Sequence, residues 1–218
     1  MRAESFVREL EASNQTWLAQ LGELSALAGT PTQPVGGMKA LLRIALANEI
    51  SVAELAAMWT PTVTDWDIKI ALAQQAGDEA RHFQLIQGRL ERLGIALDDF
   101  TPPRENPLFA YLKSLATPVE KIAAGQFTLE SIAYQVNNSF LRYCELVGDK
   151  ETAEIYRRYI QPDELHHHQL GRRLLEKYAT TPEIQLRARE AATKTLHIAA
   201  ESRAAATAKI GTGCFPGC

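Results

Sequence analysis

Apolar residues recur three and four positions apart along most of this chain, whereas the strict alternation of a half-buried strand is almost absent. This period places apolar side chains on one face of a helix, so we predict an all-α fold. Proline, glycine and capping residues divide the pattern into long helices, which we expect at about 3–28, 37–60, 64–94, 117–148, 150–179 and 181–210. A short helix is expected after Pro107, following an irregular connection over 94–106.

Two local signals refine these boundaries. Thr117-Pro118-Val119-Glu120 combines a capping box with proline at the first helical position, and therefore marks a helix start. Pro162 stands inside the segment 150–179, where it removes a backbone donor. Either the helix is kinked or widened beside Pro162, or a new helix begins there, and the sequence leaves both alternatives open.

The main chemical signal is a repeated motif, Glu79-x-x-His82 and Glu164-x-x-His167. At three-residue spacing on a helix, the carboxylate and the imidazole lie on one face and both can reach a single metal ion. One copy is common on solvated helix faces. The second copy makes metal binding the more specific interpretation.

Two further glutamates lie upstream, at intervals that fit a helix, a turn and the facing helix. Glu49 stands in an apolar stripe, and Glu130 lies in a similar stripe that also contains Gln126 and Asn137. A buried carboxylate is costly unless it loses its charge or finds a cation. Two divalent cations would neutralise four such glutamates, so we predict a two-metal site. Glu54 competes with Glu49 for the first ligand position, although its helix face is more mixed.

The remaining histidines rank below the motif pair. Only His167 follows Glu164 by three residues, so it is the predicted ligand rather than its neighbour His166. His168 is the next candidate, at the edge of the site. His197 stands alone in the last helix among alanine and threonine residues, and we expect it to be structural.

With these residues in place, the chain resembles the ferritin-like di-iron carboxylate proteins, in which two helices each supply a glutamate and two others each supply Glu-x-x-His. The resemblance covers roughly residues 37–179 and implies a ferritin-like four-helix bundle with additional N- and C-terminal helices. The metal ligands that it implies are Glu49, Glu79, His82, Glu130, Glu164 and His167. It also implies that Asp78 and Asp163 each hydrogen-bond a ligating histidine of the opposite pair and fix its tautomer. The alternative for both is a solvated helix charge.

The resemblance implies a function as well. Carboxylates and imidazoles suit iron or manganese, so we expect two Fe ions, with Mn as the alternative. The expected protein is an oxygenase or oxidase that activates O2, takes electrons from an external donor and oxidises a small organic substrate. Two alternatives stay open: ferritin-like iron storage through a ferroxidase site, and a radical-generating subunit similar to the small subunit of ribonucleotide reductase. The last family carries a tyrosine where this chain has Ile86, and Tyr134 is a possible redox-active residue instead.

Composition sets the broader limits. With 218 residues, 46% of them hydrophobic, the chain can bury one core, so we expect a single domain over 1–210 and a flexible tail over 211–218. The sequence contains no apolar run of about 18 residues and no apolar N-terminal signal segment. Its formal net charge of -3 indicates no basic patch for nucleic acid. We therefore expect a cytoplasmic protein without membrane or nucleic-acid partners, for which a homodimer is possible.

The tail carries Cys214 and Cys218, whose spacing leaves electron shuttling, metal binding, a disulfide or simple disorder open. Pairs of Cys-x-x-Cys motifs are absent, so a rubredoxin-like centre is not expected. Several other side chains are candidates either for lining a pocket or capping the bundle, or for simple packing: Gln75, Gln126, Tyr134, Asn137, Trp59 and Trp66.

Overall fold

The computed structural model describes residues 1–26, 34, 36–96, 100 and 106–217, and within these ranges every regular element is helical. The all-α prediction is confirmed. The elements are α1 (Ala3–Ala26), α2 (Gly37–Trp59), η1 (Thr60–Thr62), α3 (Trp66–Arg92), α4 (Pro107–Lys113), α5 (Pro118–Ile122), η2 (Ala123–Leu129), α6 (Glu130–Leu146), α7 (Lys150–Ile155), η3 (Tyr156–Ile160), α8 (Gln161–Tyr178) and α9 (Pro182–Ile210). The end of the expected helix 3–28 and most of the connection 94–106 lie outside the described residues. Among the described helices, none combines the length and the apolar character needed to cross a membrane.

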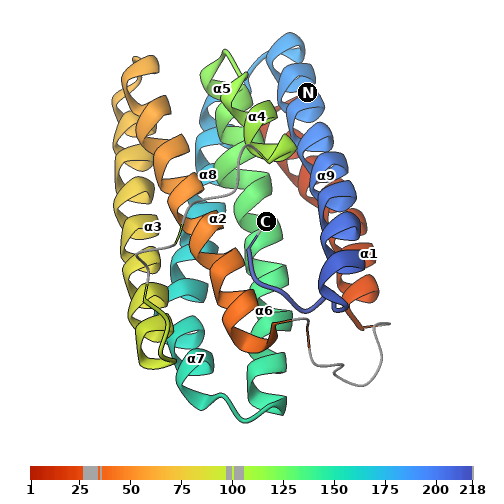
Figure 1. The fold of residues 1–218 in the computed structure, drawn as a ribbon. Helices are drawn as coiled ribbons and strands as arrows, with labels where there is room; N and C mark the ends of the chain where they lie inside the picture. The colour runs from red at the N-terminus through yellow and green to blue at the C-terminus, as the bar shows by residue number, and fades with distance from the viewer. Residues whose placement is uncertain (27–33, 35, 97–99, 101–105, 218) are drawn as a thin grey trace.

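The body of the molecule consists of long helical rods that run side by side (Figure 1). Two rods are α2 and α3, a third is the continuous run α5–η2–α6, and a fourth is the continuous run α7–η3–α8. Along the chain, α2 packs on α3, α6 packs on α8, and α3 also contacts α8. The helices at the two ends of the chain, α1 and α9, pack on each other and on this body, chiefly against α8 and η2.

A buried polar layer divides the interior into two apolar clusters. The first cluster includes Val52, Leu72, Ile132 and Leu174, and the second includes Leu46, Ile86, Phe140 and Ile160. On three rods the change from one cluster to the other falls around a predicted ligand: Glu49, Glu79 or Glu164. On the rod that contains α6 it falls beyond Glu130, between Val136 and Phe140. The helix periodicity turns all four glutamates toward the buried interior of the bundle.

Two of the rods contain a widened, π-helical turn close to a predicted ligand. The amide of Glu130 hydrogen-bonds the carbonyl of Gly125, five residues back, and the amide of Gln161 bonds the carbonyl of Tyr156 in the same way. The second widened turn immediately precedes Pro162, which has no amide and whose ring needs room beside the preceding turn. Of the two alternatives for Pro162, the widened helix is correct, because the rod is continuous through this residue. The capping box of Thr117 with Glu120 is also present.

Gly171 allows α8 to lie directly against the widened turn η2. A Cβ atom at Gly171 would stand 2.6 Å from the backbone nitrogen of Phe127 and 2.7 Å from the carbonyl carbon of Gln126. Both atoms belong to backbone that cannot turn aside as a side chain can. The glycine therefore fixes the distance between two rods that carry predicted ligands.

We expect Gly171→Ala to lower the free energy of unfolding by about 1–3 kcal/mol, because the added methyl group overpacks a closed helix contact. Gly77→Ala is the matched control, since Gly77 lies in α3 and a Cβ atom there would meet no neighbouring group within 4 Å. That substitution should instead stabilise the fold by about 0.5–1 kcal/mol, because alanine favours the helix. Urea unfolding of both variants measures the difference, and equal effects would show that the contact is not tight.

The segment after α9 folds back onto the bundle. Thr212, Gly213, Phe215, Pro216 and Gly217 are buried, and Phe215 belongs to the second apolar cluster. The expectation of a flexible tail therefore has to be revised for residues 211–217. The segment is held in place by a long-range partner, the buried Arg203 of α9. The guanidinium of Arg203 donates hydrogen bonds to backbone carbonyls of this segment. Cys218 lies outside the described residues.

Candidate metal centre

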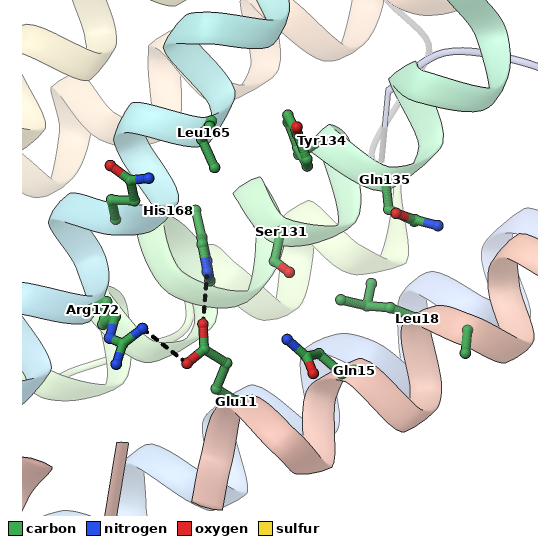
Figure 2. A pocket seen from close by; sticks show the side chains of 11 residues that line it. Glu11, Gln15, Leu18, Ser131, Tyr134, Gln135, Leu165, His168 and Arg172 are labelled. Atoms are coloured by element: carbon green, nitrogen blue, oxygen red, sulfur yellow. Dashed lines mark ion pairs between the residues drawn. The ribbon is translucent and has the colours of Figure 1, made fainter. Parts of the chain in front are cut away.

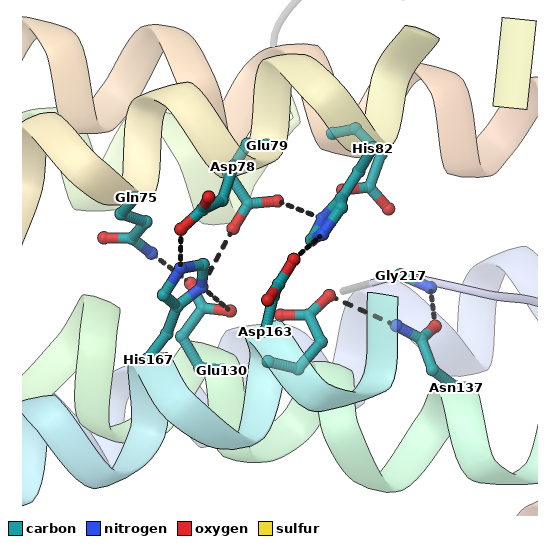
Figure 3. A network of polar contacts seen from close by, with 11 residues as sticks. Gln75, Asp78, Glu79, His82, Glu130, Asn137, Asp163, His167 and Gly217 are labelled. Carbon is teal, nitrogen blue, oxygen red and sulfur yellow. Dashed lines mark hydrogen bonds and ion pairs between the residues drawn. The ribbon is translucent and has the colours of Figure 1, made fainter. Parts of the chain in front are cut away.

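The structure brings the six predicted ligand residues together in the buried polar layer. None of them is more than 4% exposed, and they come from α2, α3, α6 and α8: Glu49, Glu79, His82, Glu130, Glu164 and His167. Figure 3 shows the side chains of α3 and α8 pointing toward one another across the layer. The two Glu-x-x-His motifs, far apart in the sequence, thus face each other.

These residues form two groups that could each hold a metal ion. One group contains Glu49, Glu79, His82 and Glu164, and the other contains Glu79, Glu130, Glu164 and His167. Within each group, one donor atom of every residue lies within 4.8 Å of the others. Glu79 and Glu164 belong to both groups, so their carboxylates lie between the two positions.

Each histidine is held by an aspartate from the facing helix. Nε2 of His82 lies 3.1 Å from Oδ2 of Asp163, and Nε2 of His167 lies 3.0 Å from Oδ2 of Asp78. The other ring nitrogen, Nδ1, faces the carboxylates: 3.2 Å from Glu79 in His82 and 3.3 Å from Glu79 in His167. The crossed aspartate–histidine hydrogen bonds that the resemblance implies are present. They aim Nδ1 of both rings at the centre of the site.

Burial raises the pKa of most of the carboxyl groups. Desolvation raises the pKa of Glu49 to about 8, although the hydrogen bond with His82 works against it. The pKa values of Glu130 and Glu164 are also raised, mainly by desolvation and, for Glu164, by the charge of Glu130. Without a cation, burial therefore favours the protonated, neutral form of these carboxyl groups.

For Glu79 and the two histidines, the pKa shifts favour the charged form instead: the pKa of Glu79 is lowered and the pKa values of His82 and His167 are raised. Burial opposes ionisation of Glu79, but hydrogen bonds with His167 and His82 outweigh it and lower its pKa well below the usual range. Burial would also lower the pKa of both histidines. Hydrogen bonds with the facing aspartates and with glutamates overcome this, raising the pKa of His167 to about 10 and that of His82 well above its ordinary value.

Two buried amides hold the glutamates in place. Nε2 of Gln75 donates a short hydrogen bond to Oε1 of Glu130, and Nδ2 of Asn137 donates to Oε1 of Glu164 at 3.4 Å. Both amides were candidates for lining a pocket, and the structure places both at the site. Gln126 is fully buried as well, and its amide atoms have no hydrogen-bond partner among the described residues.

The competing ligand candidates lie elsewhere. Glu54 is exposed, whereas Glu49 is buried, which resolves that choice in favour of Glu49. His168 does not line the site edge: its Nδ1 lies 2.7 Å from the carbonyl oxygen of Phe127, and its Nε2 lies 3.6 Å from Glu11 of α1. His166 and His197 are exposed.

Tyr134 lines a separate cavity between α1, α6 and α8. Its volume is about 490 Å³, and Figure 2 shows Tyr134 there together with Ser131, Leu165 and the ion pairs of Glu11 with His168 and Arg172. Nothing in these contacts joins Tyr134 to the carboxylate cluster. The idea that Tyr134 takes part in redox chemistry gains no support from its position.

The two tryptophans have different positions. Trp66 is 76% exposed and caps no end of the bundle. Trp59 is buried against η2, where a Cβ atom at Gly125 would stand 2.7 Å from its ring. Its role is therefore packing beside the widened turn that precedes Glu130.

Sequence reasoning missed the residues that close the site on the side of the C-terminal segment. Gly217 lines a small cavity together with the cluster glutamates, and Asn48 and Arg203 bond the same segment. Arg203 was detectable, because it continues the apolar face of α9 that contains Leu196 and Ala199. An arginine in such a position needs a buried partner.

We expect Asp78→Asn and Asp163→Asn each to weaken metal binding about 10–100-fold, because an asparagine cannot orient the histidine as a carboxylate does. Asp65→Asn is the control on α3, since Asp65 is an N-cap residue whose side chain makes no capping hydrogen bond. Competition with a chromophoric chelator measures the dissociation constants. Equal affinities of the Asp78 and Asp65 variants would show that the crossed bond does not act on the metal ligands.

Comparison with known proteins identifies a family. Residues 44–204 match the family described as "Protein of unknown function (DUF455)", and this range contains all six cluster residues. No curated protein and no solved structure matches the chain. Since the match covers most of the chain, from α2 into α9, the protein belongs to the DUF455 family.

Proposed function

We propose that this protein is a non-haem di-iron oxygenase or oxidase that activates O2 to oxidise a small organic substrate, with a mixed manganese–iron or a di-manganese centre as the variant compositions. The observation that carries the proposal is the pair of four-residue groups with two shared glutamates. A carboxylate placed between two positions can bridge two ions. Carboxylate and imidazole donors suit Fe and Mn.

Buried donor atoms whose hydrogen bonding is incomplete support the fit of cations to this site. Among the described residues, Oε2 of Glu164 is buried without a hydrogen-bond partner. Oε1 of Glu79 and Nδ1 of His167, also buried, lie 3.3 Å from each other, and Nδ1 lies 4.0 Å from Oε2 of Glu130. Buried polar atoms are normally satisfied, so an unpartnered carboxylate oxygen beside such a weakly paired couple needs an explanation. Two divalent cations would bind all three and balance the four glutamate charges.

Each residue has a definite task in this proposal. Glu79 and Glu164 would lie between the ions, Glu49 and His82 would hold one ion, and Glu130 and His167 the other. Asp163 and Asp78 hold the imidazoles with Nδ1 directed inward. Ions held in this way would supply reducing equivalents and Lewis acidity toward O2, while the apolar clusters on both sides keep bulk water away.

The test is an anaerobic Fe(II) titration of metal-free protein, followed by air, with the near-ultraviolet spectrum recorded. We expect saturation at about two irons per chain and then a discrete absorption band that stops growing. A protein that binds no iron or manganese specifically would overturn the proposal. The consumption of O2 in the presence of an electron donor should be measured next. If O2 is consumed, a search for the organic substrate is justified.

Iron oxidation for storage is the second candidate, because the cavity within the cluster is small. It measures about 10 Å³, which matches a water molecule or a small diatomic better than an organic substrate. Continued iron uptake with broad, mineral-like absorbance, and a cage-sized assembly by light scattering, would favour this candidate. The radical-generating alternative has less support, since Ile86 is buried in the second apolar cluster and Tyr134 lies in the separate cavity.

A further inference from the structure

The segment after α9 is fastened to the bundle by a set of specific contacts. The guanidinium of Arg203 donates to the carbonyl oxygens of Gly213 (3.0 Å), Phe215 (3.2 Å) and Gly217 (2.9 Å), and lies 4.1 Å from the centre of the Phe215 ring. Nδ2 of Asn48 adds a bond of 3.5 Å to the carbonyl of Pro216. Charge-assisted hydrogen bonds of this kind fix a path for the backbone.

The end of this segment is connected to the carboxylate cluster through one amide. The backbone N–H of Gly217 donates to Oδ1 of Asn137 at 3.0 Å (Figure 3). Nδ2 of Asn137 in turn donates to Oε1 of Glu164. Gly217 itself lines the small cavity beside Glu49 and Glu79. Backbone of the C-terminal segment is therefore a wall of the site.

Only glycine fits at this position. Gly217 has φ = 80°, a left-handed conformation that residues with a Cβ atom rarely adopt. A Cβ atom there would lie 2.0 Å from Nδ2 and 2.8 Å from Cγ of Asn48. Any side chain at 217 would push the segment away from α2.

We propose that residues 211–217 form a gate that closes the metal centre to molecules larger than water or O2. This proposal rests on the function proposed above, and it adds that an organic substrate reaches the centre only when the gate opens. The segment is short and irregular, and Gly211, at φ = 79° directly after α9, provides a hinge. Opening breaks a few polar contacts and releases one aromatic ring, while the helical body stays intact.

Gly217→Ala tests the gate with one methyl group. The added strain corresponds to roughly a tenfold shift toward the open segment, since 1.4 kcal/mol is a factor of ten. Gly94→Ala is the matched control: Gly94 has φ = 78° and a Cβ atom there would meet no neighbouring group within 4 Å, so it carries the same backbone strain away from the gate. Deuterium uptake of the C-terminal peptide verifies that the segment has been released.

Access to the site is then measured in two ways. In metal-free protein, a water-soluble carbodiimide with an amine labels Glu49 and Glu164, and peptide mapping gives the rates. In Fe(II)-loaded protein under anaerobic conditions, the rate of iron extraction by a bulky chelator gives a second value. We expect both rates to rise roughly tenfold in Gly217→Ala and to stay unchanged in Gly94→Ala.

Two outcomes would overturn the gate: a released segment with unchanged access rates, or rapid labelling of both glutamates in the unsubstituted protein. Failure of the proposed function is a separate result, since it is seen as absent metal binding or absent reaction with O2, while the labelling rates still report the gate. If Gly217→Ala does not release the segment, Arg203→Lys is compared with Arg187→Lys. Arg187 is an exposed arginine of the same helix, 58% exposed, so only the Arg203 variant loses contacts with the gate.

Discussion

Glu79→Gln is expected to abolish binding of both metal ions, although only one carboxylate oxygen is replaced. Glu79 belongs to both four-residue groups, and its low pKa makes it the cluster glutamate that is already ionised in the metal-free site. Glu49→Gln, which changes a residue of one group only, should remove one ion and leave the other. Metal analysis after anaerobic loading should therefore give about two ions per chain for the unsubstituted protein, about one for Glu49→Gln and none for Glu79→Gln. This order is expected if Glu79 is a ligand of both ions.

Glu54→Gln is the control for both substitutions, because Glu54 is an exposed glutamate of the same helix as Glu49. It should bind as many ions as the unsubstituted protein. Loss of one ion in the Glu79 variant and retention of the other would show that the carboxylate does not bridge. Circular dichroism should be unchanged in all variants, since glutamine has nearly the volume of glutamate.

Metal binding is expected to release protons and to strengthen steeply with rising pH. Ligands bind as neutral imidazoles and ionised carboxylates, yet the pKa of His167 is raised to about 10 and that of Glu49 to about 8. Both groups therefore hold a proton at pH 7 and must lose it to a cation. Affinity should rise about tenfold per pH unit for each proton released. Calorimetric titration with Mn(II) in two buffers of different ionisation enthalpy measures the number of protons.

The same shifts predict the stability of the metal-free protein. The contribution of His167 is fully present below its unfolded pKa of 6.5 and is lost as the pH rises toward 10, and Glu49 acts in the same sense between 4.5 and about 8. The melting temperature of metal-free protein should therefore fall from pH 6 to pH 9, and bound metal should reverse this trend. Binding heats independent of the buffer, or a melting temperature that rises over this range, would contradict the assignment.

Much of the fold could be predicted from the chain because helix periodicity is a local property. The long helices, the capping box at Thr117 and the disturbance beside Pro162 all depend on neighbouring residues. The two widened turns were not predicted in full, because moving one hydrogen bond from the fourth to the fifth residue hardly alters the apolar pattern. The position of residues 211–217 was missed for a different reason, since it depends on Arg203 and Asn137, contacts that local composition does not reveal.

The candidate site could be predicted because the Glu-x-x-His motif occurs twice in the sequence. The spacing of the two motifs, and the apolar surroundings of Glu49 and Glu130, indicated which side chains would meet, and Glu54 was separated from Glu49 only by burial. The crossed bonds of Asp78 and Asp163 came from the resemblance rather than from spacing. Iron and manganese accept the same donors, so the identity of the metal stays a prediction.

The crossed aspartates have a mechanical consequence for the helices that carry them. The two bonds join α3 to α8 in opposite directions. In one, Asp78 of α3 contacts His167 of α8, and in the other, Asp163 of α8 contacts His82 of α3. A slide of one helix past the other by one turn, about 5.4 Å, would break both bonds together and separate both motifs. The register of α3 against α8 is thereby fixed as a single unit, and disorder cannot enter one half of the centre while the other half stays intact.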